Sequence, residues 1–443
     1  MEQAPKKGIF YGWWIVAVCM LVLLVHAGCG FYSFGVLNKT LQEAFDTNRG
    51  TISGAVSLYM LMMGLTAPFV GRLTDRYGPK KLVLWGALIV GTAFLLLNRA
   101  SAVWHLYVLF LVIGIGMSGA GLVPVSFAVS NWFTRKRGLA MGVTMVGIAL
   151  GGLLVTLLTN YLVDAFSWRV AFVALGILTW VLIIPATMLL MKTRPQDMGL
   201  LPDGESPVTR ETVPAVEMVQ ATADPEPTAS ALKVVLRNRP LLLIMAAFFF
   251  AGLAIGGLLQ HEHAFFTDMG ISMASAGLML AVTGGIGGIG KLFFGFLADK
   301  IPPRRVAIMC FALQVVGMTI LMLMQSVPMM WVYVMMWMFV IVFGFAMGGQ
   351  IALQPLVTTQ FFGLASFGAI FGVVALAAGV GVSLGPLLAG GIFDLLGSYR
   401  LAFFTFAAGY TVAITALLLL ARYPEAKTGN GDVLRQIGFG RAM

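Results

Sequence analysis

The sequence is poor in charge and in the side chains that usually perform chemistry. Only 10% of its 443 residues are Asp, Glu, Lys or Arg, and it has four histidines and three cysteines. A soluble domain carries about 25% charged residues, so this composition excludes an ordinary soluble protein. Cys19, Cys29 and Cys310 all lie inside apolar runs. Their scattered positions predict neither a disulfide framework nor a metal site, and we expect no cofactor.

Long apolar runs fill most of the chain, which is 59% hydrophobic with a mean hydropathy of +0.93. Each run has roughly 20 residues, enough to cross ~30 Å of hydrocarbon as a helix. We therefore predict an all-α membrane protein with twelve transmembrane helices. The predicted spans are 13–37, 51–71, 82–98, 104–130, 138–162, 168–190, 240–266, 273–297, 305–325, 329–355, 365–392 and 399–421.

The formal net charge of +10 could suggest a nucleic-acid partner, but its distribution indicates a membrane orientation instead. Lys and Arg crowd alternate connections between the predicted spans, together with both termini. The intervening connections hold only Lys39, Arg49, Arg99, Arg169 and Arg400. This asymmetry follows the positive-inside rule. It predicts a multi-pass protein of the plasma (inner) membrane with both termini cytoplasmic and no nucleic-acid partner.

The two halves of the chain repeat each other. GRLTDRYGPKK at 71–81 matches GFLADKIPPRR at 295–305, and SWRVAF at 167–172 matches SYRLAF at 398–403. Internal repeats of this kind build many transporters, with the substrate site between the repeats near the bilayer midplane. We predict two pseudo-symmetric six-helix bundles. The expected domains are 1–191 for the first bundle, 192–238 for a flexible cytoplasmic linker, 239–423 for the second bundle and 424–443 for a cytoplasmic tail.

The repeated loop resembles the cytoplasmic signature between the second and third helices of the major facilitator superfamily. The first copy matches at seven positions, and the second copy is degenerate, with Pro302 replacing its second glycine. We interpret the motif as a tight turn whose aspartate meets helix N-termini and neighbouring arginines and so latches the bundles. A basic loop that only sets topology is the alternative. The expected gate residues are Gly71, Asp75, Arg76, Gly78, Lys80, Gly295 and Asp299.

Further segments resemble the branch of monocarboxylate porters and oxalate–formate antiporters within that superfamily. They include Tyr11-Gly12-Trp13-Trp14, Asn131-Trp132-Phe133, and His261 with Asp268-x-Gly270-Ile271-Ser272. A segment at 194–204, RPQDMGLLPDG, is similar to bacterial members of the branch. The resemblance implies a transporter, not an enzyme, that moves small organic anions such as lactate, pyruvate or formate.

Lys291 belongs to neither set of loop cations. Gly285 to Lys291 fits G-x-x-x-x-G-K, yet no strand precedes it and Leu292 stands where a nucleotide loop needs Ser or Thr. Lys291 lies eight residues before Asp299, about 12 Å along a helix. An intramembrane cation costs about 2.5–3.5 kcal/mol and usually faces a wet cavity, although a snorkelling lysine is the alternative.

In the resembling porters this position typically carries an arginine that binds the substrate carboxylate. We therefore predict that Lys291 binds the anion. Lysine keeps the charge but loses the bidentate fork of arginine, which puts selectivity for a dicarboxylate in doubt.

The stretch QHEHAFFTD at 260–268 supplies a second polar cluster. Glu262 is the one carboxylate that we place inside a predicted span, so we predict that it couples transport to protons, together with His261. The alternative is a cluster that is merely exposed to water.

Other polar residues lie on helices that line the cavity in the resembling superfamily. With Lys291 and His261, the expected substrate contacts are Tyr32, Tyr59, Ser118, Gln350 and Gln354.

These observations predict a secondary transporter of monocarboxylates that works by alternating access and is coupled to protons. The expected partners are the organic anion, a proton or counter-anion and the lipid bilayer, and we expect a monomer. An exchanger of dicarboxylates or of oxalate and formate, or a drug antiporter, is the main alternative. It is raised by Gly372, Gly381, Gly385 and Pro386, which resemble a glycine signature of superfamily antiporters. A receptor that binds an organic acid without moving it is a further alternative.

Overall fold

The computed structural model describes residues 10–204 and 238–426, and every regular element in those two stretches is helical. Twelve of these helical segments are long and apolar enough to cross a membrane. This confirms the predicted fold class. The first half contains α1 (Gly12–Ala27), the π-helical turn η1 (Gly28–Tyr32), α2 (Ser33–Ala44), α3 (Arg49–Tyr77), α4 (Pro79–Leu97), α5 (Val103–Gly119), α6 (Leu122–Trp132), α7 (Arg137–Ala165) and α8 (Trp168–Leu190). The second half contains α10 (Arg239–Asp268), α11 (Met273–Ala298), α12 (Pro303–Met324), α13 (Met329–Phe362), α14 (Phe367–Leu396) and α15 (Arg400–Leu419).

Short polar residues mark where several of these helices begin. The side chains of Asn48, Ser167, Asn238 and Ser272 each accept a hydrogen bond from a backbone N–H in the first turn of the helix that follows. Such caps satisfy amide groups that a helix leaves without an internal partner. The sharp turn between α3 and α4 uses Gly78, whose φ of +82° favours glycine, followed by a proline at the first position of α4.

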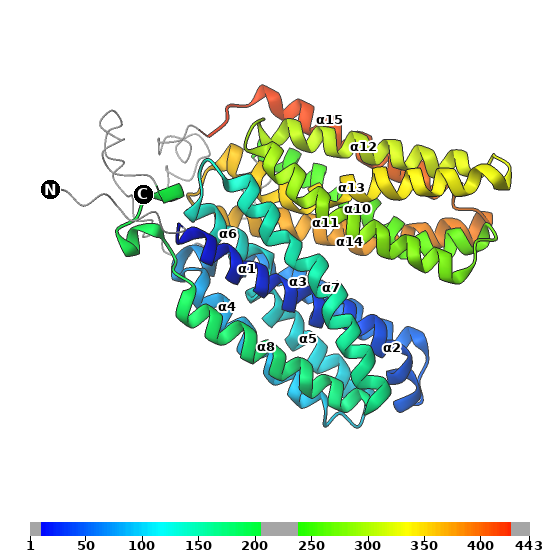
Figure 1. The fold of residues 1–443 in the computed structure, drawn as a ribbon, viewed down its shortest axis with the longest axis horizontal. Helices are drawn as coiled ribbons and strands as arrows, with labels where there is room; N and C mark the ends of the chain where they lie inside the picture. Colours follow the sequence, from blue (N-terminus) through cyan, green and yellow to red (C-terminus); the bar gives the residue numbers. More distant parts are fainter. Residues whose placement is uncertain (1–9, 205–237, 427–443) are drawn as a thin grey trace.

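The helices form two bundles, α1 to α8 and α10 to α15, that lie together at one end and diverge toward the other (Figure 1). The bundles meet mainly through two helix pairs, α3 with α14 and α7 with α11, and α7 with α13 and α6 with α14 add smaller contacts. We call the end where α1 begins and where these pairs touch the closed end. Glycines make the approach possible: a Cβ on Gly71 would overlap the carbonyl oxygen of Gly368, and one on Gly138 would overlap that of Gly295.

The connection between the bundles begins as an ordered segment. Residues 192–204 contain the short 3-10 helices η2 (Pro195–Met198) and η3 (Pro202–Gly204) and make hydrogen bonds to the first bundle. This differs from the expected flexible linker, because side-chain and backbone groups of the segment find partners on the bundle surface. Residues 205–237, the rest of that linker, and residues 427–443 of the expected tail lie outside the described residues.

Candidate functional site

Lys291 lies in α11 at the place where the two bundles cross. A Cβ on Gly142 of α7 would overlap the carbonyl oxygen of Lys291, and a Cβ on Gly348 of α13 would lie 2.8 Å from its backbone nitrogen. The residue is only 5% exposed. Its ammonium group forms no ion pair or hydrogen bond with any residue that the structure describes. A buried cation without a protein partner is costly, so the site is suited to an anionic ligand.

The glycines around Lys291 allow close helix packing. A Cβ on Gly290 would overlap the carbonyl oxygen of Phe345, and one on Gly287 would lie 3.2 Å from that of Gly344. Both carbonyls belong to α13, so α11 and α13 approach backbone to backbone here. Small residues at such crossings are typical of membrane helices. The glycine-rich run is therefore part of a helix crossing, and its helical conformation differs from that of a nucleotide-binding loop.

Glu262 is fully buried between α10 and α11. Its Oε1 accepts a hydrogen bond of 3.1 Å from the hydroxyl group of Thr283, and its Oε2 has no hydrogen-bond partner in the part of the chain that the structure describes. Thr283 precedes Lys291 by eight residues on the same helix, about 12 Å along its axis. The carboxyl group thus has one oxygen fixed by a neutral donor and one oxygen free to carry a proton. Sequence reasoning missed Thr283, because no local spacing links it to Glu262.

His261 points to a different side of α10. Its Nδ1 lies 3.0 Å from the hydroxyl group of Tyr399, and its Nε2 lies 3.1 Å from the carbonyl oxygen of Pro386. A neutral imidazole satisfies both contacts if Nε2 donates to the carbonyl and Nδ1 accepts from the tyrosine. Both ring nitrogens therefore have protein partners, and the side chain ties α10 to α14 and to the start of α15. The structure separates His261 from Glu262, its neighbour in the sequence.

The other predicted contacts fall into two groups. Ser118 Oγ and Gln350 Oε1 are buried and have no hydrogen-bond partner within residues 10–204 and 238–426, as expected of groups that await a ligand or water. Gln354 donates to the carbonyl oxygen of Val374 at 3.3 Å. Tyr59 is 1% exposed and packs inside the first bundle, whereas Tyr32 is 40% exposed in the π-helical turn. Gln350 and Gln354 share α13, the helix that packs beside Lys291.

Two aspartates connect the bundles at the closed end in the same way. Asp75 Oδ1 and Oδ2 each accept a hydrogen bond of 2.8 Å, from the backbone N–H groups of Gly368 and Ala369. Asp299 accepts from Gly138 at 2.6 Å and from Leu139 at 2.9 Å. Each carboxylate thus meets the N-terminus of a helix in the opposite bundle, where free N–H groups and the helix dipole favour negative charge.

Burial raises the pKa of the Asp299 carboxyl, and its two backbone hydrogen bonds act in the opposite direction. The charge of Asp203 adds to the rise in this pKa, and the charge of Arg137 opposes it. The pKa of Asp299 therefore depends on charges at the first residue of α7 and in the segment after α8.

The remaining gate residues shape the loops around these aspartates. Gly71 and Gly295 lie at the helix crossings, and Gly78 forms the turn beside Thr193. Lys80 Nζ donates to the carbonyl oxygen of Met188 at 2.7 Å, and the Arg76 guanidinium lies over the ring of Tyr77.

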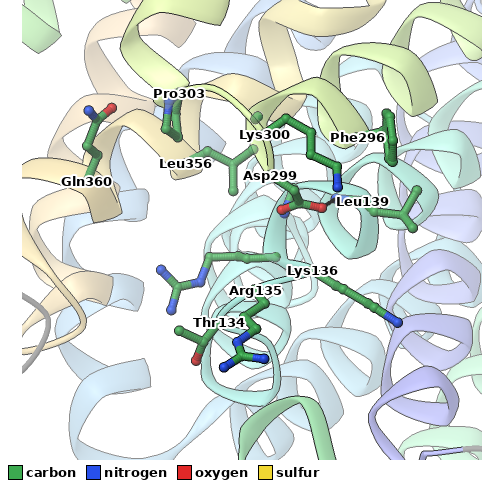
Figure 2. A pocket seen from close by; sticks show the side chains of 13 residues that line it. Thr134, Arg135, Lys136, Leu139, Phe296, Asp299, Lys300, Pro303, Leu356 and Gln360 are labelled. Atoms are coloured by element: carbon green, nitrogen blue, oxygen red, sulfur yellow. Dashed lines mark hydrogen bonds between the residues drawn. The ribbon is translucent and has the colours of Figure 1, made fainter.

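A cavity of about 590 Å³ opens beside Asp299 at the closed end. Asp299 lies against the start of α7, with Arg135 and Lys136 on the loop before that helix (Figure 2). The lining residues are Thr134, Arg135, Lys136, Arg137, Gly138, Leu139, Phe296, Ala298, Asp299, Lys300, Pro303, Leu356 and Gln360. Lys291 is not among them, so this basic cavity is separate from Lys291 and lies beside the Asp299 contact.

Comparison with known proteins gives a consistent result. The family model of the Major Facilitator Superfamily matches residues 18–367 and 263–435. The chain is 24% identical over 432 residues to monocarboxylate transporter 12 of Mus musculus, covering 95% of this chain and 86% of the relative. It is 25% identical over 415 residues to an MFS-type transporter of Gibberella moniliformis, covering 90% and 89% of the two chains.

A solved structure shares the fold. The proton:xylose symporter XylE, bound to 6-bromo-6-deoxy-D-glucose, matches with a TM-score of 0.71 and 16% sequence identity, covering 96% of this chain and 99% of that one. At this identity the likeness speaks for the fold alone. The family model, however, spans nearly the whole chain, and this chain is a membrane transporter that belongs to the Major Facilitator Superfamily.

Proposed function

We propose that this protein is a secondary active transporter of small monocarboxylates, with Lys291 as the residue that binds the carboxylate. The observation that carries the proposal is the burial of Lys291 at the crossing of the two bundles, where its ammonium group has no partner among the described side chains. A carboxylate would offset the cost of burying this cation. Similarity along nearly the whole chain to proteins named monocarboxylate transporters supports the choice of substrate.

We also infer the orientation and the state of the carrier. The connections rich in Lys and Arg lie at the closed end, so the positive-inside rule places that end in the cytoplasm of the plasma membrane. The bundles diverge toward the opposite end (Figure 1), and the structure then corresponds to a carrier closed on the cytoplasmic side. Alternating access would require the two aspartate contacts to break on that side while the opposite end closes.

Glu262 is the residue that we propose for proton coupling. It is a fully buried carboxyl with one free oxygen, and it contacts the helix that carries Lys291. Protonation removes its charge from the low-dielectric interior, and release restores that charge. Movement of α11 against α10 would change the Thr283 contact and so connect proton binding to the rocking of the bundles. The His261 contacts favour a structural tie for that residue in this conformation.

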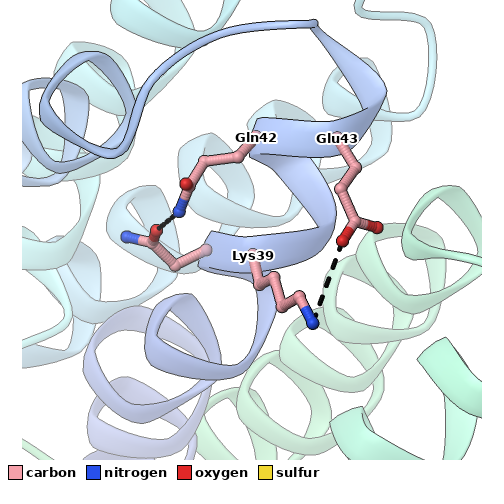
Figure 3. Close-up of polar contacts among 4 residues, drawn as sticks. Lys39, Gln42 and Glu43 are labelled. Atoms are coloured by element: carbon pink, nitrogen blue, oxygen red, sulfur yellow. Dashed lines mark hydrogen bonds and ion pairs between the residues drawn. The ribbon is translucent and has the colours of Figure 1, made fainter.

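The test is uptake of radiolabelled lactate, pyruvate and formate into proteoliposomes under an imposed pH gradient. Lys291→Ala should reduce uptake about 30-fold or more, because truncating one member of a buried charge pair costs about 2 kcal/mol or more. Lys39→Ala is the matched control. Lys39 is exposed at the diverging end and lies 4.0 Å from Glu43 (Figure 3), and such a surface pair contributes little. Absence of uptake of any monocarboxylate by the wild type would refute the proposal.

Exchange of anions remains a second outcome of the same experiment. The glycine signature in α14 has a packing role: a Cβ on Gly381 would overlap the carbonyl oxygen of Phe249, and one on Gly385 that of Leu253. These contacts hold α14 against α10 within one bundle, so they do not by themselves favour exchange. Counterflow into preloaded vesicles without a pH gradient would identify an exchanger. Saturable binding without uptake would identify a receptor.

A further inference from the structure

We propose that Asp203, in the segment after α8, is a positioning residue of the gate. It holds the loop before α7 so that the first amide groups of α7 face Asp299 of the other bundle. The inference rests on the proposed alternating-access mechanism. It also gives a role to the RPQDMGLLPDG segment, which neither the substrate site nor the proton site uses.

Two carboxylates accept hydrogen bonds from neighbouring backbone amide groups, one on the loop between α6 and α7 and the other in the first turn of α7. Asp203 Oδ2 accepts from the N–H groups of Thr134 at 2.8 Å and of Arg135 at 2.7 Å, and its Oδ1 accepts from that of Lys136 at 3.3 Å. Asp299 accepts hydrogen bonds from the N–H groups of residues 138 and 139. Asp203 belongs to the same bundle as the loop, whereas Asp299 belongs to the other. One carboxylate can therefore stay bound while the other is released.

The segment that carries Asp203 is anchored along its length. Trp132 Nε1 donates to the carbonyl oxygen of Lys192 at 3.0 Å, and Thr193 lies against Gly78 in the turn after Asp75. Farther along, Gly204 approaches the ring of Phe10, since a Cβ there would lie 2.9 Å from it. The segment thus runs from the turn after Asp75 to the start of α7, which binds Asp299. It can hold Asp203 in place because both of its ends are fixed.

The second gate contact lacks this arrangement. The loop at 363–366 precedes α14 as the α6–α7 loop precedes α7. Asp75 accepts hydrogen bonds from the N–H groups of residues 368 and 369 in the first turn of α14. In the described part of the chain, no carboxylate accepts from the amide groups of residues 364–366. The two copies of the gate are therefore unequal, and Asp203 accounts for the difference.

Position and charge predict opposite effects of removing this carboxylate. If Asp203 mainly positions the amide groups, its loss weakens the Asp299 contact and favours opening of the closed end. If its negative charge mainly repels Asp299, its loss strengthens that contact, because the Asp203 charge raises the pKa of Asp299. The Asp203 carboxylate accepts three hydrogen bonds from loop amide groups that have no carbonyl partner within a helix. These bonds favour the first effect. The sign of the response therefore tests the inference.

The experiment measures distances between spin labels at Lys81→Cys and Arg305→Cys in the full chain, reconstituted without substrate. Both residues are exposed at the closed end, one in each bundle, and the three native cysteines are buried. The test variant is Asp203→Asn, which keeps the size of the side chain and tolerates its φ of +59°. The matched control is Asp197→Asn, which removes the same charge from the same segment. Asp197 caps only its own turn, through the N–H of Arg194 at 3.1 Å.

We expect Asp203→Asn to raise the ratio of open to closed distances about 10-fold, which corresponds to about 1.4 kcal/mol, and Asp197→Asn to leave it unchanged. In an Asp299→Asn background, Asp203→Asn should add little, because it acts through the same contact. An unchanged ratio, a shift toward closed distances, or equal effects of Asp203→Asn and Asp197→Asn would each overturn the inference. A lower thermal stability with an unchanged ratio would show a merely structural role. The measurement needs no substrate. The inference about Asp203 can therefore fail while the proposed transport of monocarboxylates holds, and that proposed transport can fail while the inference holds.

Discussion

Replacing Lys291 by methionine should stabilise the protein and abolish recognition of its substrate. Methionine is unbranched and of similar length, so it fills a similar space without a charge. Lys291 is 5% exposed, and its ammonium group has no partner among the described residues. An intramembrane cation costs about 2.5–3.5 kcal/mol on the insertion scale, and water near the site lowers this figure. We therefore expect a gain of about 1–3 kcal/mol in the free energy of unfolding.

The assay is the apparent melting temperature of the purified protein in detergent, with and without a saturating monocarboxylate. A ligand present at 100 times its dissociation constant stabilises the wild type by about 2.7 kcal/mol. Lys291→Met should melt at a higher temperature than the wild type without ligand and should show no shift when ligand is added. Lys39→Met, at the exposed ion pair, should keep the ligand shift and the wild-type melting temperature.

Two results would refute this reasoning. A lower melting temperature for Lys291→Met would mean that the ammonium group has a stabilising protein partner, and the site would not await an anion. A ligand shift that persists in Lys291→Met would place the carboxylate elsewhere. Lys291→Arg separates charge from geometry, because arginine adds a bidentate fork but needs more room between the helices.

The remaining predictions concern the gate, the helix crossing and the proton site. Asp75→Asn loses one of two charge-assisted hydrogen bonds and should make a cysteine at the closed end about 10-fold more reactive toward a membrane-impermeant maleimide; unchanged reactivity would contradict a latch. Gly142→Ala places a methyl group against the carbonyl oxygen of Lys291 and should slow uptake severalfold. Gly277→Ala, where a Cβ meets open space, should leave uptake unchanged. Equal effects of the two variants would exclude a role for the crossing of α7 and α11. Glu262→Gln should abolish uptake driven by a pH gradient and preserve counterflow, and loss of both would indicate a structural role instead.

The bilayer explains why the fold was predictable from the sequence. Every backbone group inside the membrane must be paired within the protein, so an apolar run of the right length is a helix. The sequence contains twelve such runs, and the described residues contain twelve helical segments long and apolar enough to cross a membrane. The repeat of 71–81 at 295–305 predicts one aspartate in each copy that meets a helix N-terminus, and Asp75 and Asp299 both contact helix N-termini in the opposite bundle. These features depend on local composition or on direct repetition, which one sequence displays.

The direction of individual side chains was not predictable in the same way. His261 and Glu262 were grouped because they are adjacent, yet adjacent residues on a helix point about 100° apart. One contacts α14 and α15, and the other contacts Thr283 of α11. The docking of residues 192–204 was also missed. The composition of the whole linker is polar and rich in proline, and it conceals a short segment whose order comes from tertiary hydrogen bonds such as those of Asp203.

The position of Lys291 and Asp299 on one helix suggests how substrate and gate communicate. The two residues are eight positions apart on α11, and a rigid helix moves both together. Between them, Gly295 contacts Gly138, and the carbonyl of Lys291 itself meets Gly142, so α11 slides against α7 over a surface with few side chains to unpack. Breaking the Asp299 contact costs hydrogen bonds to two amide groups, and an unpaired Lys291 adds the cost of moving a buried charge. In the proposed monocarboxylate transporter, a carboxylate bound at Lys291 would remove the second cost but not the first, and would so favour rocking of the loaded carrier over the empty one.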